Sequence, residues 1–115
     1  ILCYPVITFH EPYAHKGSMK NQLGPTPTEQ MLNLLSNEMQ VTAQTPPAFI
    51  WHTVDDPGVP VENSLLFADA LACQRVPFEL HVYQSGQHGL GLAPEKPHIA
   101  TWSQLCGEWL NGLGF

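Results

Sequence analysis

The chain has 115 residues, of which 43% are hydrophobic, so its length and composition allow one domain with a modest core. Ten acidic against four basic residues give a formal net charge of −6, which argues against nucleic-acid and anionic-membrane partners, since both need basic surfaces. No apolar run approaches the ~20 residues of a membrane span, and the chain does not open on the charged and apolar regions of a signal peptide.

The three cysteines, Cys3, Cys73 and Cys106, lack C-x-x-C spacing and fall in apolar segments. We expect buried free thiols, which favour a reducing, cytoplasmic compartment. Because the chain opens on Ile1, inside a predicted strand, we also expect the true N-terminus to lie upstream. Secretion therefore stays open.

The chain begins with a predicted strand and a long loop. Ile1 to Tyr4 is short and apolar and ends at Pro5, which is typical of a buried strand followed by a loop. From Thr8 to Gly24 the sequence is polar and shows neither helical nor strand periodicity. We expect an unusually long loop there, of the kind that often borders a site.

A helix-start pattern follows. Thr26 is the expected N-cap, with Pro27 at the first helical position and Glu29 closing a capping box. The helix should fade near Asn37, before a short turn around residues 38–41.

The middle of the chain predicts a strand, a helix and a second strand. Residues 48–52 are apolar without alternation, which suits a strand covered on both faces in a parallel sheet. Residues 61–75 predict a helix with four apolar residues at core spacing, namely Leu66, Phe67, Ala70 and Leu71. Residues 78–83 alternate, so we expect one buried face, and the three elements form a right-handed βαβ unit.

The end of the chain predicts a loop and a helix. The Gly- and Pro-rich stretch 86–97 contains His88, and residues 98–111 follow as a helix with one apolar stripe. The stripe consists of Ile99, Trp102, Leu105, Cys106, Trp109 and Leu110. With no repeat and no linker, the fold class is α/β, a single domain of parallel strands with flanking helices.

Two acids and a histidine directly follow the two predicted central strands. In open α/β sheets functional side chains gather at the carboxyl ends of strands, where Asp55, Asp56 and His88 all fall. A carboxylate that accepts the imidazole Nδ1 proton leaves Nε2 free to take a proton from a hydroxyl. The order of acid then histidine is found in one class of serine hydrolases. The alternative is that the acids cap a helix and the histidine satisfies backbone groups.

The segment Trp51-His-Thr-Val-Asp-Asp-Pro-Gly-Val-Pro-Val-Glu-Asn-Ser64, with Gly86-Gln-His-Gly-Leu-Gly91, closely resembles the α/β-hydrolase superfamily. The likeness is to the branch of small acetylesterases and acetyl-xylan-esterase-like carbohydrate esterases. It covers nearly the whole chain, because residues 4–7 resemble the strand and loop after the nucleophile elbow in that branch. The resemblance implies that Asp56, the first residue of D-x-x-V-P, is the triad acid and His88 the base, with Asp55 a structural neighbour.

The other five histidines have weaker claims on a functional role. We expect His81 to point outward from its alternating strand, His98 to begin a helix and His52 to end a strand. His10 and His15 lie in the long loop. A metal site built from His10, His15 and His52 lacks H-x-x-x-H or carboxylate-rich spacing, so we expect no metal and no cofactor.

The sequence departs from the family pattern at the nucleophile. That serine should sit in G-x-S-x-G, and none of the serines does: Ser18, Ser36, Ser64, Ser85 and Ser103. We therefore expect residues 1–115 to be the C-terminal portion of a single α/β-hydrolase domain, with the nucleophile elbow, the oxyanion hole and the early strands missing. A non-catalytic binding or assembly module is the alternative, but it would leave an open sheet edge and a bare core.

The resemblance implies a serine carboxylic-ester hydrolase that forms an acyl-enzyme on short acyl groups, such as acetyl esters of sugars or xylan. A serine peptidase of the same superfamily is a further alternative, and this chain alone should be inactive. The expected partners are a small-molecule or saccharide ester and the missing N-terminal half, with a homo-oligomer left open. We expect the loop from Thr8 to Gly24, with Phe9 and Tyr13, to form part of a substrate wall or a subunit contact, and Trp51 to be core rather than a sugar platform.

Overall fold

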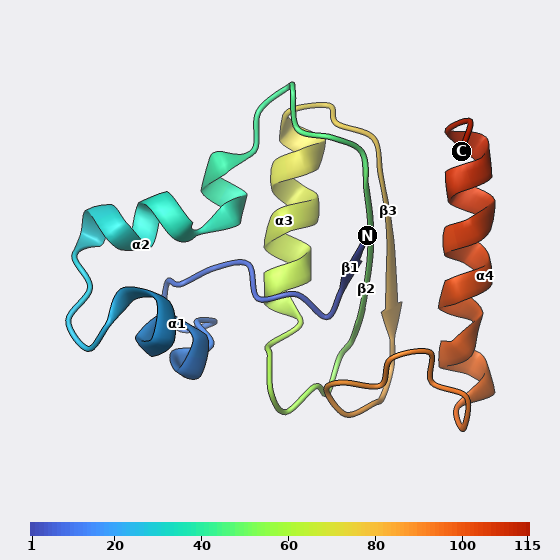
Figure 1. Ribbon diagram of the computed structural model, residues 1–115, viewed down its shortest axis with the longest axis horizontal. Helices are drawn as coiled ribbons and strands as arrows, with labels where there is room; N and C mark the ends of the chain where they lie inside the picture. Colours follow the sequence, from blue (N-terminus) through green and yellow to red (C-terminus); the bar gives the residue numbers. More distant parts are fainter.

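The computed structural model describes all 115 residues, which form one parallel sheet between two helices. The strands lie in the order β1 (Leu2–Cys3), β2 (Ala48–Thr53) and β3 (Phe78–Tyr83). Helix α3 (Glu62–Cys73) covers one face of the sheet and α4 (Pro97–Gly112) covers the other (Figure 1). The predicted α/β class, with parallel strands and flanking helices, is confirmed.

The central strand β2 organises the sheet. It pairs with β1 at Leu2 and Ile50, and with β3 over its whole length, from Ala48 opposite Phe78 onward. All six residues of β2 are buried, as its unbroken apolar run predicts. The loops that leave β2 and β3 therefore start at the same edge of the sheet, at the bottom of Figure 1.

Each face of the sheet has its own apolar core, because side chains of β2 alternate between the two faces. The core under α4 consists of Phe49, Trp51, Tyr83, Ala93, Ile99 and Cys106. The core under α3 consists of Ala48, Ile50, Ala68, Leu71 and Val76. Trp51 is fully buried, so the prediction that it belongs to the core is confirmed. The predicted stripe of α4 is also confirmed, since all six of its residues belong to or pack against the first core.

The structure corrects the predicted buried faces of α3 and β3. In α3 Leu71 is buried, but the other predicted core positions are only half-buried, and the buried positions at the start of the helix are Asn63 and Ser64. In β3 burial is not one-sided, because α4 lies over the face that carries His81. The His81 ring packs against Phe49, with ring centroids 5.2 Å apart, instead of pointing outward.

The predicted loop from Thr8 to Gly24 contains a helix, α1 (Lys16–Leu23). The prediction missed α1 because this helix buries none of its residues and has no apolar stripe. Its N-cap is His15, whose Nδ1 accepts the amide of Ser18 at 3.2 Å. Ring nitrogens are not among the usual capping groups.

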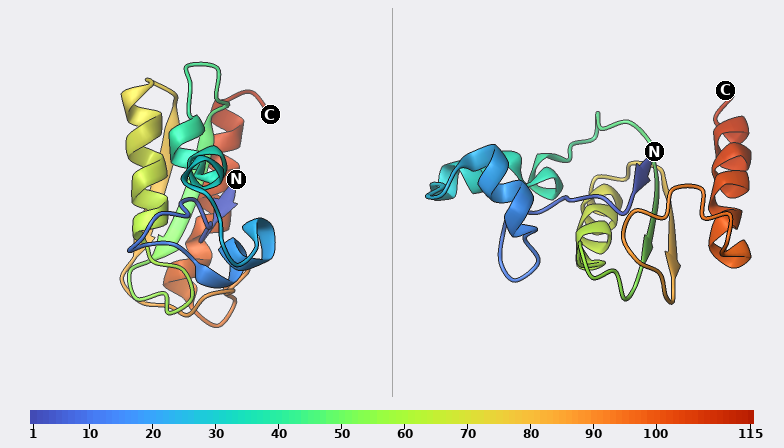
Figure 2. Two further views of the ribbon diagram at one scale, coloured as in Figure 1. Left: turned by 90° about the vertical axis from the view of Figure 1, so that its left-hand side faces the viewer. Right: turned by 60° about the horizontal axis from the view of Figure 1, so that its bottom comes forward.

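Helix α2 (Glu29–Leu35) is capped by Thr28 and not by Thr26, since Thr28 Oγ1 accepts the amide of Met31 at 3.3 Å. Glu29 is thus the first helical residue, where its charge favours the helix dipole, and no capping box forms. The short turn is confirmed as a 3₁₀ helix, η1 (Asn37–Gln40). Helices α1 and α2 lie on the α3 side of the molecule, far from α4 (Figure 2). None of the helices combines the length and apolar character needed to cross a membrane.

The three cysteines are free. Cys106 is buried as predicted and Cys3 is half-buried, but Cys73 is exposed at the end of α3. The prediction of burial is therefore wrong for Cys73.

Candidate active site

The turn after β2 holds the Asp56 carboxylate. Asp56 Oδ1 accepts the amides of Gly58 at 2.7 Å and Val59 at 3.0 Å, a local pattern typical of aspartate in turns. The side chain of Asp56 is fully buried. Gly58 allows a close approach of the two loops, since a Cβ there would lie 3.1 Å from the Cβ of His88.

Asp56 meets His88 across the edge of the sheet. Asp56 Oδ2 lies 2.8 Å from His88 Nδ1. An ionised carboxylate only accepts hydrogen bonds, so Nδ1 carries the hydrogen and Nε2 is left as an acceptor. The His88 side chain is 40% exposed and no hydrogen bond within the chain uses its Nε2. The two predicted site residues are thus in contact, and the imidazole nitrogen that could take a proton is accessible.

The Asp56 carboxyl is kept ionised by its hydrogen bonds. Burial acts to raise its pKa, but the hydrogen bonds from the Val59 amide, the His88 ring and the Gly58 amide outweigh burial and leave the pKa below its usual value. The acid is therefore charged at neutral pH, as an orienting partner for an imidazolium must be.

Asp55 hydrogen-bonds the start of the loop that carries His88, here called the histidine loop, and does not contact His88 itself. Its carboxylate accepts Ser85 Oγ at 2.7 Å and the amide of Gly86 at 2.7 Å. These two hydrogen bonds, that of Ser85 first, lower the pKa of Asp55. Thr53 Oγ1 donates to the carbonyl of Gly86 at 2.6 Å, so both backbone groups of Gly86 are held from the β2 end.

A second clamp holds the same loop at Gly91. The Gly91 amide donates to the Tyr4 hydroxyl at 3.2 Å, and its carbonyl accepts the Trp102 indole N–H at 3.0 Å. The Tyr4 ring also meets the His88 ring in a T-shaped contact, with centroids 4.7 Å apart. Tyr4 sits just past β1 with φ at 39°, a conformation that non-glycine residues rarely adopt. Sequence reasoning assigned no role to Tyr4.

Beneath the acid, His52 fills the core with both ring nitrogens partnered. Its Nδ1 lies 2.7 Å from Ser64 Oγ, and its Nε2 lies 3.0 Å from the carbonyl of Val59 and 3.4 Å from Asp56 Oδ2. Burial, the largest cause, lowers the pKa of His52, although the Val59 carbonyl and Asp56 oppose it. The 3.4 Å contact with Asp56 is therefore made by a neutral imidazole and is not an ion pair. His52 does not end its strand, which continues to Thr53.

Asn63 joins the turn that carries Asp56, here called the acid turn, to the segment after β1. Its Oδ1 accepts the amides of Ile7 and Thr8, at 2.8 and 3.0 Å, and its Nδ2 donates to the carbonyls of Tyr13 and Pro60. All four hydrogen-bonding positions of this buried amide are thus used. Sequence reasoning missed Asn63, and the signal that could have found it is a polar residue at a core position of an otherwise apolar helix.

The remaining histidines lie apart from Asp56 and His88, which we call the couple. His10 Nδ1 is 3.9 Å from Glu29, His15 caps α1, and the His98 ring packs edge-on against Tyr83. His81 Nε2 bonds Glu79 at 2.6 Å. His, Cys, Asp and Glu side chains nowhere come together in a group of three that could hold a metal ion.

None of the serine hydroxyls is a partner of His88. Each is engaged elsewhere: Ser18 with His15, Ser36 with the amide of Phe9, Ser64 with His52, Ser85 with Asp55 and Ser103 with the carbonyl of Ala100. The structure therefore pairs His88 Nε2 with none of the serine hydroxyls of residues 1–115.

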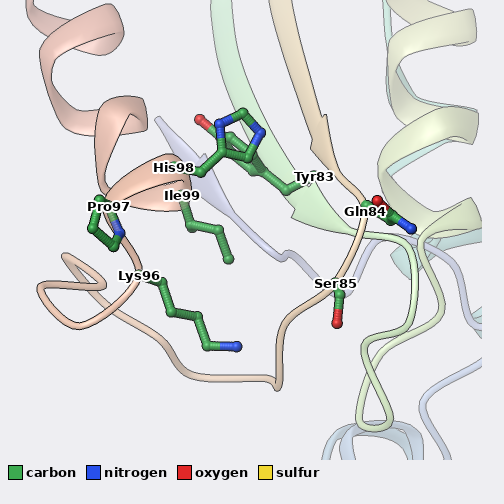
Figure 3. Close-up of a pocket in the computed structure, with 7 residues that line it drawn as sticks. All are labelled: Tyr83, Gln84, Ser85, Lys96, Pro97, His98 and Ile99. Carbon is green, nitrogen blue, oxygen red and sulfur yellow. The ribbon is translucent and has the colours of Figure 1, made fainter.

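A shallow pocket lies between the end of β3 and the start of α4 (Figure 3). Its lining consists of Tyr83, Gln84, Ser85, Lys96, Pro97, His98 and Ile99. Lys96 extends from the α4 side toward the strand end that carries Ser85, and its charge helps to lower the pKa of Asp55. Neither Asp56 nor His88 lines this pocket. Of the two aromatic residues in the loop expected to form part of a substrate wall, Phe9 is buried and Tyr13 is half-buried.

Comparisons with known sequences place this geometry in context. A model of the prolyl oligopeptidase family matches residues 6–111. The endo-1,4-β-xylanase B of Butyrivibrio fibrisolvens is 47% identical over 103 residues, which are 90% of this chain and 16% of that protein. An acetylxylan esterase of Xylanibacter ruminicola is 32% identical over 117 residues, covering 98% of this chain and 24% of that protein.

Solved structures give the same picture. An acetyl ester-xyloside bifunctional hydrolase from Caldicellulosiruptor lactoaceticus superposes with a TM-score of 0.96 at 50% identity, over 100% of this chain and 42% of that one. A carboxylesterase of Lactobacillus plantarum superposes with a TM-score of 0.81 at 32% identity, over 99% of this chain and 44% of that one. The chain thus spans less than half the length of each of these proteins, and the resemblance that residues 51–64 carry is confirmed.

Proposed function

Because this chain belongs to the prolyl oligopeptidase family, within the α/β-hydrolase superfamily, we propose that it carries the acid and the base of a serine carboxylic-ester hydrolase. Asp56 is the acid and His88 is the base. The single observation that carries this proposal is the 2.8 Å contact between Asp56 Oδ2 and His88 Nδ1, which leaves an accessible Nε2. A residue that only capped a helix or satisfied backbone groups would not need an exposed, unpartnered ring nitrogen.

The nucleophile in this proposal is a serine outside residues 1–115. Support comes from the serine hydroxyls described above, all of which are engaged away from His88. Residues 1–115 then form the C-terminal portion of one hydrolase domain, with the elbow and the early strands contributed by the rest of it. The lengths of the relatives leave room for such a segment.

The reaction follows from what each group can do. The serine hydroxyl attacks the ester carbonyl while His88 Nε2 takes its proton, and Asp56 stabilises the imidazolium that forms. His88 then returns this proton to the leaving alcohol, which departs and leaves the acyl-enzyme. Water then attacks the acyl carbon while Nε2 takes one of its protons. The bond between the acyl carbon and the serine oxygen breaks, His88 returns the proton to that oxygen, and the carboxylic acid is released.

The substrate class is proposed as short acyl esters of sugars or xylan. Support is the naming of the relatives, an acetylxylan esterase and an acetyl ester-xyloside hydrolase among them. The family name favours a second candidate function, which is peptide hydrolysis by the same acyl-transfer mechanism. The two differ in the leaving group, an alcohol or an amine, which an assay can separate.

The test uses the full-length protein that contains this chain. We expect it to hydrolyse p-nitrophenyl acetate and acetylated xylo-oligosaccharides, and to leave a prolyl-peptide anilide intact. His88→Ala should remove the ester activity without changing the thermal unfolding midpoint by more than a few degrees. Cleavage of the anilide in preference to the ester would move the assignment to the peptidase alternative, and a fully active His88→Ala variant would remove the proposed base.

A further inference from the structure

We propose that His52 is a positioning residue for the acid, a neutral buried imidazole that holds the Asp56 carboxylate and its turn from beneath. The inference rests on the proposed function, because it assigns a role toward the proposed acid. It does not make His52 a catalytic residue, since His52 is fully buried and has no access to a substrate.

The hydrogen positions on His52 follow from its partners. The Val59 carbonyl, 3.0 Å from Nε2, can only accept, so Nε2 carries the hydrogen. Nδ1 is then the acceptor for Ser64 Oγ at 2.7 Å. This neutral tautomer agrees with the lowered pKa of His52, for which burial is the main cause. The titratable groups that act on the ring are Asp56 and His88.

The Nε2–H of His52 faces two atoms of the acid turn. Besides the Val59 carbonyl it lies 3.4 Å from Asp56 Oδ2, the same oxygen that accepts His88 Nδ1. The Val59 amide in turn donates to Asp56 Oδ1. His52 therefore hydrogen-bonds the carbonyl of Val59, the residue whose amide holds Oδ1, and its Nε2 also lies within 3.4 Å of Oδ2 without a second hydrogen bond.

An imidazole that served only to fill the core would not need this arrangement. A purely structural role requires only that the buried carbonyl of Val59, a residue that is 2% exposed, has a hydrogen-bond donor. A positioning role predicts in addition that His52 shares the charge of Oδ2 with His88. Without the His52 N–H the carboxylate charge is less stabilised, so it should hold the proton on His88 more strongly. The base would then be unprotonated, and active, only at higher pH.

The test compares His52→Leu with His52→Gln in the full-length protein, assayed with p-nitrophenyl acetate across pH 5 to 9. Leucine removes the donor at similar volume, whereas the glutamine Nε2 restores a neutral donor near the same place. We expect His52→Leu to lose about 10- to 100-fold in kcat, the range that loss of an orienting partner costs elsewhere, with KM unchanged. The acidic limb of its kcat/KM profile should move to higher pH, and His52→Gln should regain most of the rate and the original limb.

The outcomes separate this inference from the proposed function. If His88→Ala abolishes activity but a folded His52→Leu variant keeps the wild-type rate and profile, the positioning role is overturned and the proposed function stands. Equal losses in both His52 variants with an unmoved acidic limb also overturn it. If His52→Leu does not fold, Ser64→Ala decides: a several-fold loss with the same shift supports the role, and an unchanged profile overturns it. Full activity of His88→Ala overturns the proposed function and the positioning role together.

Discussion

Replacing Asp56 by asparagine in the full-length protein tests the proposed acid with a minimal change of shape. The asparagine Oδ1 can keep the amides of Gly58 and Val59, so the turn is preserved. Its NH₂ group then replaces Oδ2 and presents a donor to His88 Nδ1 at 2.8 Å. Two donors cannot pair, so His88 must move its hydrogen to Nε2, where it can no longer take a proton from a hydroxyl.

The neighbouring acid supplies a matched control. Asp55→Asn removes the same charge one residue away. Its Oδ1 can still accept the amide of Gly86, and its NH₂ can donate to Ser85 Oγ, because a hydroxyl both donates and accepts. The histidine loop therefore stays clamped, and the tautomer of His88 is untouched.

We expect Asp56→Asn to lower kcat by roughly 10³- to 10⁴-fold, as the equivalent change does in other serine triads. That loss corresponds to about 4 to 5.5 kcal/mol at ~1.36 kcal/mol per tenfold. Asp55→Asn should lose less than about tenfold, since its hydrogen bonds survive and only an exposed charge is removed. The assay is the steady-state hydrolysis of p-nitrophenyl acetate, with thermal unfolding as the folding control. A larger loss in Asp55→Asn than in Asp56→Asn would reverse the assignment of the acid.

Three further outcomes are expected. Gly86→Ala should destabilise the full-length protein by about 1 to 3 kcal/mol in urea unfolding, because its Cβ would lie 2.8 Å from Leu90 and 2.9 Å from Thr53, and an unchanged unfolding midpoint would contradict this packing. The free energy of unfolding should fall as the pH drops below about 6.5, since the lowered pKa of His52 means that the unfolded chain binds more protons there than the folded chain. In His52→Gln the free energy of unfolding should depend less on pH in this range. An equal pH dependence in the two proteins would refute His52 as the cause. The 115-residue chain alone should hydrolyse p-nitrophenyl acetate no faster than its His88→Ala variant, and activity that the substitution abolishes would place the nucleophile within the chain.

The elements that sequence predicted well are those that bury an apolar face. The run from Ala48 to His52 became a fully buried central strand, and the stripe of α4 packs as its spacing indicates. Helix α1 was missed because nothing in it is buried and a histidine caps it. Propensity and capping by the usual residues are weak signals when no packing face accompanies them.

The site was predictable only where its chemistry follows the strand ends. Asp56 and His88 could be paired from topology, because loops after adjacent parallel strands start at one edge. The supporting contacts of Tyr4, His52 and Asn63 depend on which side chains meet in space. A histidine in an apolar strand is expected to be a core residue, and only the folded structure shows that His52 Nε2 lies 3.4 Å from Asp56 Oδ2.

The contacts that hold Asp56 and His88 all come from residues 1–115. Asp56 is held by the amides of its own turn, with His52 Nε2 3.4 Å from Oδ2, and the loop that carries His88 is held by Asp55, Tyr4 and Trp102. All of these groups belong to residues 1–115, so the position of His88 Nε2 does not depend on the proposed serine. A segment that supplies the serine therefore has to present its hydroxyl to a base already in place. Under the proposed function, the rest of the domain has to place the serine hydroxyl within hydrogen-bond distance of the exposed His88 Nε2.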